Sequence, residues 1–201
     1  SKEMPWPGSR CGWIEVYNRR RDPMFATYVQ SILNAKMLEV CSTTLPQAVL
    51  PRIKAHPLYR EHLKHRIKRY ERYSNLAYDI LKNVKGLLVN RTNGAFYMSA
   101  VFEEGVLNHQ QSLPIASTEV RETVERLVSG SSVQPDKRFV YYLLAATGIC
   151  VVPLSSFATD LQGFRITLLE KDEDDFVEIF QTIAASIRRY IDSNQTCSRC
   201  A

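Results

Sequence analysis

Apolar side chains recur every three to four residues along much of this chain, and that spacing predicts amphipathic helices. The stripes predict long helices over 23–40, 58–84 and 174–191 and shorter helices over 47–55, 117–127 and 137–146. Asp22 precedes the first of these helices and Gly86 follows the second, as expected for helix ends. We expect Asp136 to cap the helix over 137–146 and Gly148 to close it.

Between the helices, short apolar runs bounded by turn residues predict β-strands. These runs lie at 12–17, 87–90, 95–102, 149–153 and 164–169. Asn93-Gly94 separates the second run from the third and is typical of a hairpin turn. Helices and strands share the chain, so the sequence predicts an α/β fold class.

Composition and charge narrow the function classes. The chain has 201 residues, a net charge of +5 and 45% hydrophobic residues, which suits a globular protein that binds anionic ligands. No apolar run approaches the roughly 18 residues that span a bilayer, and no segment is typical of a signal peptide. The five cysteines are scattered and odd in number, so we expect no disulfide framework and a reducing, cytoplasmic location.

The first ten residues carry the strongest candidate chemistry. Lys2 and Arg10 are separated by a turn rich in proline and glycine. A lysine that forms a Schiff base with pyridoxal phosphate needs a nearby cation for the cofactor's phosphate, and arginine binds phosphate through two parallel hydrogen bonds. The alternative is a solvated basic turn at the end of the chain.

Four segments, taken in chain order, resemble one known family. They are Lys2–Trp13, Asn93–Tyr97, Thr147–Pro153 and Gly163–Leu168. They resemble the class I/II aminotransferases of the fold-type I pyridoxal-phosphate-dependent family, and the last two segments are most similar to alanine aminotransferases. The resemblance implies transfer of an amino group from an amino acid to a 2-oxo acid. It also implies a homodimer with active sites at the subunit interface.

The resemblance also implies roles for individual residues. Lys2 would form the Schiff base and move a proton at the substrate's Cα. Arg10 would bind the cofactor's phosphate, with Ser1 as a weaker candidate. Arg165 would bind the substrate's α-carboxylate. Because Arg165 lies between two apolar residues in a predicted strand, it should point to the opposite face of the sheet from them; the alternative is a strand-end arginine in solvent.

The resemblance further predicts how the chain is divided. Residues 1–55 map onto the end of a large cofactor-binding domain, and 56–192 map onto a linking helix and a small α+β domain. The polar segment 193–201 is expected to be a disordered tail. This organisation predicts the C-terminal half of an aminotransferase, which would be inactive alone because the other half supplies the rest of the cofactor site.

Two other functions stay open. Lyases and decarboxylases of the same fold would use Lys2, Arg10 and Arg165 as well. A non-catalytic binding module would use the basic, tyrosine-containing stretch 60–72 to bind RNA or an acidic partner. We favour a plainer explanation of that stretch, the solvated face of an amphipathic helix whose tyrosines point to the core, and therefore predict no nucleic-acid partner.

No metal site is predicted. Cys197 and Cys200 form one Cys-x-x-Cys pair near the end of the chain, and the four histidines lie far away in the sequence. Zinc sites of this kind use four ligands. A disordered tail is therefore the favoured interpretation of the pair.

Two loops bear on the predicted site. The family usually has glycine after the Val-Pro pair, whereas this chain has Leu154, which lacks glycine's freedom at positive φ. The loop must therefore take another path or line a pocket of different shape. Ser42-Thr43-Thr44 lies where the family's chain approaches the neighbouring subunit's cofactor, and capping of the next helix is an equally good explanation.

Overall fold

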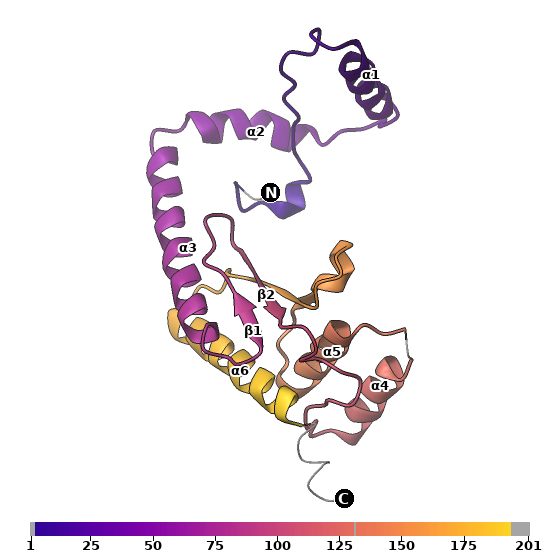
Figure 1. Cartoon of the computed structure of the whole chain (residues 1–201). Helices are drawn as coiled ribbons and strands as arrows, with labels where there is room; N and C mark the ends of the chain where they lie inside the picture. Colours follow the sequence, from indigo (N-terminus) through magenta and orange to yellow (C-terminus); the bar gives the residue numbers. More distant parts are fainter. Residues whose placement is uncertain (1–2, 131, 194–201) are drawn as a thin grey trace, which may run out of the picture. The chain divides into compact units, whose positions relative to one another are not determined.

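The computed structural model describes residues 3–130 and 132–193 (Figure 1). The chain forms two compact units, 1–65 and 66–201, which we call unit 1 and unit 2. Helices and strands share the chain, and the predicted α/β class is confirmed. The assignment of 1–55 to a large domain and 56–192 to a small domain stays a prediction.

Unit 1 is helical. It contains a 3₁₀ turn, η1 (Pro7–Ser9), helices α1 (Pro23–Met37) and α2 (Thr44–Ala55), and the start of α3 (Tyr59–Leu81). Asp22 caps α1 as predicted, because its carboxylate accepts hydrogen bonds from the backbone N–H groups of Met24 and Phe25. The long predicted helix is also present as α3, although it ends at Leu81, before Gly86.

The strand predicted over 12–17 is wrong. These residues are all described, and none of them belongs to a strand. Trp13, Ile14 and Tyr17 are exposed. A strand satisfies its backbone N–H and C=O groups by pairing with a neighbouring strand, and the described part of unit 1 contains no strand with which 12–17 could pair. The apolar pattern alone could not supply that partner.

Unit 2 is built on an antiparallel sheet. Its described strands are β1 (Leu87–Val89), β2 (Tyr97–Phe102), β3 (Val152–Pro153) and β4 (Gly163–Thr167), in the order β1-β2-β4-β3. The predicted hairpin between the first two strands is confirmed, with Leu87 opposite Phe102. The left-handed residue of the turn is Ala95, one position after the predicted Asn-Gly pair.

Helices α4 (Thr118–Val128), α5 (Pro135–Thr147) and α6 (Glu173–Asp192) complete unit 2, together with a 3₁₀ turn, η2 (Leu154–Phe157). Figure 1 shows α6, in yellow, beside the sheet. Side chains from one face of the sheet join those of the helices in one core. Its large members include Leu81, Met98, Phe102, Phe139, Leu143, Phe164, Phe176, Phe180, Ile187 and Tyr190.

The other face of this sheet is only partly covered. Along β2, buried Met98, Ala100 and Phe102 alternate with half-buried side chains. Along β4, Arg165 is half-buried between two buried neighbours. The alternation of a strand therefore separates a core face from a more open face, and the open face carries Arg165.

Two predictions about helix ends have different outcomes. Gly148 closes α5 in the left-handed conformation, as predicted. Asp136 does not cap α5: the N-cap is Gln134, Asp136 is the second helical residue, and its carboxylate binds groups outside the helix. Pro135 explains the difference, because proline is preferred at the first helical position and so fixes where the helix begins.

Residues at both ends of the chain carry predictions that lie outside the described residues. These residues are Ser1, Lys2, Cys197 and Cys200, together with the rest of the predicted tail from 194 onward. Ser193 is described and ends α6, where its hydroxyl donates to the carbonyl of Tyr190. Within the described residues, no helix is long and apolar enough to cross a membrane.

Candidate functional site

Arg10 lies directly after the 3₁₀ turn of unit 1, in a backbone conformation that is uncommon for its type. Its φ of 49° and ψ of 46° are left-handed, which costs a non-glycine residue about 1–2 kcal/mol. The turn itself is fixed by Ser9, whose N–H and hydroxyl both donate to the carbonyl of Trp6. The sequence predicts a turn rich in proline and glycine at this point, and the structure shows that hydrogen bonds hold it.

An open pocket of about 600 Å³ lies beside Arg10 in unit 1, a volume within the range of small-molecule sites. The end of α1, the loop before α2, one face of α2 and the segment after Arg10 line it. Its polar lining includes three cations, one carboxylate and two hydroxyls: Arg10, Lys36, Lys54, Glu39, Ser42 and Thr43. Positive charge exceeds negative charge, so the pocket favours an anion.

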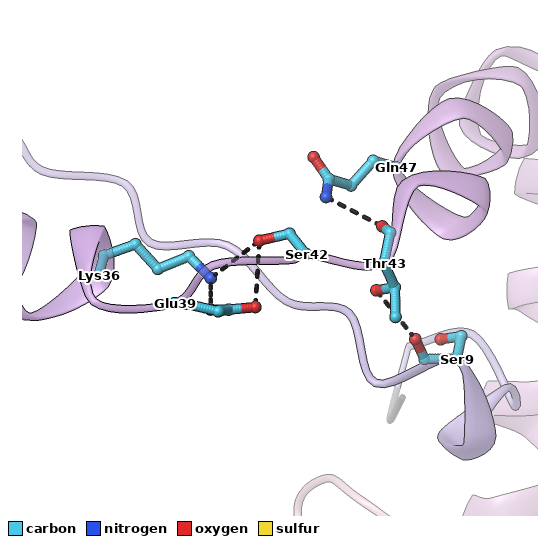
Figure 2. A network of polar contacts seen from close by, with 6 residues as sticks. All are labelled: Ser9, Lys36, Glu39, Ser42, Thr43 and Gln47. Atoms are coloured by element: carbon cyan, nitrogen blue, oxygen red, sulfur yellow. Dashed lines mark hydrogen bonds and ion pairs between the residues drawn. The ribbon is translucent and has the colours of Figure 1, made fainter.

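A network of polar contacts holds one side of this pocket (Figure 2). Lys36 forms an ion pair with Glu39 and donates to the Ser42 hydroxyl at 3.4 Å, and that hydroxyl donates to Glu39 at 3.0 Å. The Thr43 hydroxyl reaches across to the carbonyl of Ser9 at 3.4 Å, next to Arg10. The network therefore links the loop before α2 to the turn that presents Arg10.

Two explanations of Ser42-Thr43-Thr44 are a cap for the next helix and an approach to a neighbouring subunit's cofactor, and the structure bears on the first. Thr43 occupies the N-cap position of α2, but its side chain makes no capping hydrogen bond. Its hydroxyl donates instead to the carbonyl of Ser9. Side-chain capping by Thr43 is therefore wrong, and the approach of this loop to a neighbouring subunit's cofactor stays a prediction.

The cations of this pocket differ in their partners. Lys54 forms an ion pair with Glu3 at 3.5 Å and lies over the ring of Trp13. A hydrogen bond from the Tyr59 hydroxyl, assisted by Lys54, lowers the pKa of Glu3 against the opposing effect of burial. Among the described residues, no carboxylate forms an ion pair with Arg10, whose guanidinium donates to the carbonyl of Pro7 at 3.3 Å. Arg10 is thus the cation of this pocket with the most donors left for a ligand.

Arg165 lies over two aromatic rings on the open face of the unit 2 sheet. Its guanidinium carbon lies 4.6 Å from the ring centroid of Tyr97 and 4.2 Å from that of Phe157. Its cross-strand neighbours are Ser99 on β2 and Val152 on β3, neither of which is charged. The expectation that Arg165 points away from its two apolar neighbours in β4 is confirmed.

These ring contacts leave the N–H donors of the guanidinium available to a ligand. Aromatic rings interact with the two flat faces of a guanidinium, whereas its N–H donors lie in the plane. Within the part of the chain that the structure describes, no carboxylate forms an ion pair with Arg165. The arrangement is therefore suited to an incoming carboxylate, which can accept two parallel hydrogen bonds.

The turn that follows Pro153 positions Phe157 over Arg165. Leu154 is buried in η2 and does not adopt a positive φ, which falls instead on Ala158 at the end of the turn. That the loop follows another path than the family's, or lines a pocket of different shape, stays a prediction. A Cβ atom on Gly163 would lie 2.9 Å from a Leu154 methyl carbon and 2.2 Å from the Ala100 carbonyl, so glycine is required there.

The basic stretch 60–72 has its own partners within unit 2. Arg69 donates to the carbonyl of Glu170, and Arg72 pairs with Glu173 at 2.5 Å. Tyr73 is buried in the core and its hydroxyl donates to the backbone carbonyl of Lys171. The expectation that tyrosines of this helix point to the core is confirmed for Tyr73, and two of its arginines are engaged with the start of α6.

The sequence singles out Arg10 and Arg165 as candidates but does not predict their surroundings. Lys36 and Lys54 line the pocket beside Arg10, and Tyr97 and Phe157 stack on Arg165, yet none of the four is a predicted site residue. Strand alternation could have indicated Tyr97, which lies within the segment 95–102. Among the described residues, no group of three histidine, cysteine, aspartate or glutamate side chains could hold a metal ion.

Comparisons with known proteins agree on one family. The family model for aminotransferase class I and II matches residues 1–180. An uncharacterized aminotransferase of Methanocaldococcus jannaschii is 52% identical over 191 residues, which cover 95% of this chain and 44% of that protein. A probable mitochondrial alanine aminotransferase of Dictyostelium discoideum is 27% identical over 176 residues, which cover 83% of this chain and 29% of that protein.

A solved structure agrees with these relatives. The aspartate aminotransferase of Rhizobium meliloti matches 83% of this chain and 35% of its own, with 26% identity and a TM-score of 0.55. This chain therefore spans less than half the length of each of the three proteins.

Proposed function

Because this chain belongs to the aminotransferase class I and II family, we propose that the whole protein transfers an amino group from an amino acid to a 2-oxo acid with pyridoxal 5′-phosphate as its cofactor. When bound, pyridoxal phosphate supplies an aldehyde and a ring that draws electrons from the substrate's Cα. We assign to residues of this chain the binding of the cofactor, the orientation of the substrate and the movement of protons.

Arg10 is the residue of this chain that we assign to the cofactor's phosphate. The pocket beside it carries more positive than negative side chains and has the volume of a small-molecule site. A phosphate dianion fits the donors there, because Arg10 has unpaired N–H groups and two hydroxyls lie near it. Lys2 is proposed to attach the cofactor through its amine and to move a proton at the substrate's Cα; Ser1 is a weaker phosphate ligand.

Arg165 is assigned to the substrate's α-carboxylate, and its environment is the observation that carries the proposal. The guanidinium lies over the rings of Tyr97 and Phe157, and no described carboxylate forms an ion pair with it. An α-carboxylate is common to all amino acids and 2-oxo acids. A fixed arginine therefore orients both substrates of a transamination in the same way.

The remaining features of the proposal concern the whole protein. We propose that it acts as a homodimer, that 1–55 belongs to the large domain and 56–192 to the small one, and that the present chain alone is inactive. A reducing, cytoplasmic location is supported by Cys11, Cys41 and Cys150, which are free. Lyases and decarboxylases of the same fold would release a fragment of the substrate, whereas a transaminase conserves its carbon skeleton.

An absorbance titration tests the cofactor site. Pyridoxal phosphate is added to the chain, the product is reduced with borohydride, and the labelled peptide is mapped by mass. We expect a saturable band and one adduct on Lys2, which Lys2→Ala removes. Arg10→Ala should weaken binding tenfold or more, from the loss of a charged hydrogen-bonding partner.

Two matched variants serve as controls. Lys85→Ala removes an exposed lysine and Arg20→Ala an exposed arginine, and neither lines the pocket. Both should bind the cofactor like the unchanged chain. Diffuse labelling of many lysines that Lys2→Ala leaves unaltered would contradict the assignment of Lys2. With the whole protein, release of carbon dioxide or of a side-chain fragment in place of a 2-oxo product would contradict transamination.

A further inference from the structure

Asp136 is a buried carboxylate that the proposed chemistry does not use. Its side chain is fully buried, with an exposed fraction of 0%. No described lysine, arginine or histidine forms an ion pair with it. Burying an unpaired carboxylate is costly unless hydrogen bonds replace its water. The structure must therefore compensate the charge in another way.

Three donors from outside α5 provide that compensation. One carboxylate oxygen of Asp136 accepts from the backbone N–H groups of Ser155 at 2.9 Å and Gly163 at 3.3 Å. The other oxygen accepts from the Ser155 hydroxyl at 2.7 Å. Asp136 is also the second residue of α5, where the positive end of the helix favours a negative charge.

These contacts join the two segments that form the surroundings of Arg165. Ser155 lies in η2, two residues before Phe157, and Gly163 begins β4, two residues before Arg165. One carboxylate therefore fixes the start of both short segments against the same helix. The distance between the Phe157 ring and the Arg165 guanidinium, 4.2 Å, depends on how these two segments are held relative to each other.

We propose that Asp136 is a positioning residue for Arg165: it holds η2 against β4 so that Phe157 covers one face of the guanidinium and leaves its donor edge toward the substrate carboxylate. Asp136 touches neither substrate nor cofactor and acts only through Ser155 and Gly163. The proposal rests on the role assigned to Arg165. It extends that role by naming what keeps the arginine in its binding orientation.

The stacking itself can be measured by NMR on the 201-residue chain. Protons near the face of an aromatic ring are shifted upfield, so the Nε–Hε signal of Arg165 reports its distance from Phe157. Arg165→Lys identifies the signal, and Phe157→Leu gives its position when that ring is missing. We expect Asp136→Ala, which removes all three contacts, to move the signal at least half of the way to its position in Phe157→Leu.

Two variants separate positioning from a general loss of stability. Asp136→Asn keeps one oxygen for the N–H groups of Ser155 and Gly163 and places an amide beside the Ser155 hydroxyl, so it should restore most of the stacked signal. Asp174→Ala is the matched control, because Asp174 is also the second residue of a helix but is exposed. It should leave the Arg165 signal unchanged.

The position of the Arg165 signal in Asp136→Ala decides the proposal. If Asp136→Ala lowers the unfolding temperature but leaves the Arg165 signal as it is in Asp174→Ala, Asp136 has only a structural role and the proposal is overturned. Should Asp136→Ala fail to fold, Ser155→Ala removes one of the three contacts. It must then produce a smaller shift in the same direction, and an unchanged signal there overturns the proposal as well.

A separate measurement tests the role of Arg165 on which the proposal rests. Pyruvate, a simple 2-oxo acid, is titrated into the unchanged protein while the Arg165 signal is followed. A signal that moves with pyruvate supports carboxylate binding. A signal that does not move would overturn the role of Arg165 in the proposed function, whereas the comparison of Asp136→Ala with Phe157→Leu would still show whether Asp136 positions the side chain.

Discussion

Unit 1 and unit 2 use their apolar side chains in different ways. In unit 2 the apolar residues of the sheet and its helices meet in one core, where Leu143, Ile183 and Ile187 are fully buried. In α1 of unit 1, which is described throughout, only Val29 is buried. Many apolar residues of unit 1 are exposed, among them Trp13, Ile14, Tyr17, Met24, Tyr28, Met37, Leu38, Val40 and Leu45.

This difference shows that apolar periodicity predicts a helix without predicting its burial. The stripe along α1 has the spacing of a core-facing helix, and the helix is present. Burial also needs a second apolar surface to pack against. So many exposed apolar side chains are typical of an interaction surface. We therefore expect the stability of unit 1 to depend more than that of unit 2 on contacts with other protein surfaces.

The largest expected effect compares one phenylalanine in each unit. Phe180 on α6 is buried and stacks on Phe176 with ring centroids 4.5 Å apart, whereas Phe25 on α1 is partly exposed. Phe180→Ala should lower the free energy of unfolding by about 3–5 kcal/mol. Phe25→Ala should change it by about 0.5 kcal/mol or less. Urea unfolding of both variants measures the two changes. Equal losses in the free energy of unfolding would contradict the difference in burial between the two units.

The second prediction compares the two arginines in the whole protein. Arg10→Lys should weaken cofactor binding and leave amino-acid affinity nearly unchanged, whereas Arg165→Lys should do the reverse. Lysine keeps the charge but cannot make two parallel hydrogen bonds. A lost charged hydrogen bond is worth about 1.5–3 kcal/mol, or roughly 10- to 150-fold in affinity. Cofactor titration and substrate kinetics measure the two effects, and a variant that weakens both ligands alike would contradict separate roles.

A third, smaller effect uses one glycine from each unit. Gly163 is enclosed by the backbone of β2 and by Leu154, whereas nothing lies within 4 Å of a Cβ on Gly12. Gly163→Ala should destabilise the protein by about 1–3 kcal/mol because the strands must separate. Gly12→Ala should stay within about 0.5 kcal/mol. Thermal unfolding provides the measurement, and a neutral Gly163→Ala would mean that β2 and β4 can move apart freely.

The smallest effect concerns pH in unit 1. The hydrogen bond from Tyr59 lowers the pKa of Glu3 below its usual 4.5. Since the folded pKa lies below the unfolded one, this contact stabilises the protein above the unfolded value and is lost as the pH falls through the folded value. An NMR titration of the Glu3 carboxyl should show the lowered pKa. Tyr59→Phe should raise it toward 4.5, and an unchanged pKa in that variant would exclude the hydrogen bond as the cause.

Much of the secondary structure could be predicted because local signals determine it. The stripes of α1, α3 and α6, the Asp22 cap and the left-handed Gly148 all depend on residues within a few positions of one another. The strand expected over 12–17 failed because a strand needs a distant partner. The cap expected at Asp136 failed because Pro135 fixed the helix start two residues earlier than predicted, leaving the carboxylate to bind elsewhere.

Motifs and their spacing predict the family and the α/β class correctly and single out Arg10 and Arg165 as candidate site residues, because residue type and spacing carry that information along the chain. The surroundings of the two arginines depend on contacts between segments that are distant in the sequence. Phe157 and Tyr97 come from separate segments, and Asp136 reaches Ser155 and Gly163 across 19 and 27 positions. Such contacts form when the core closes, and the exposed stripe of α1 shows that the same pattern without an opposing surface leaves its side chains in solvent.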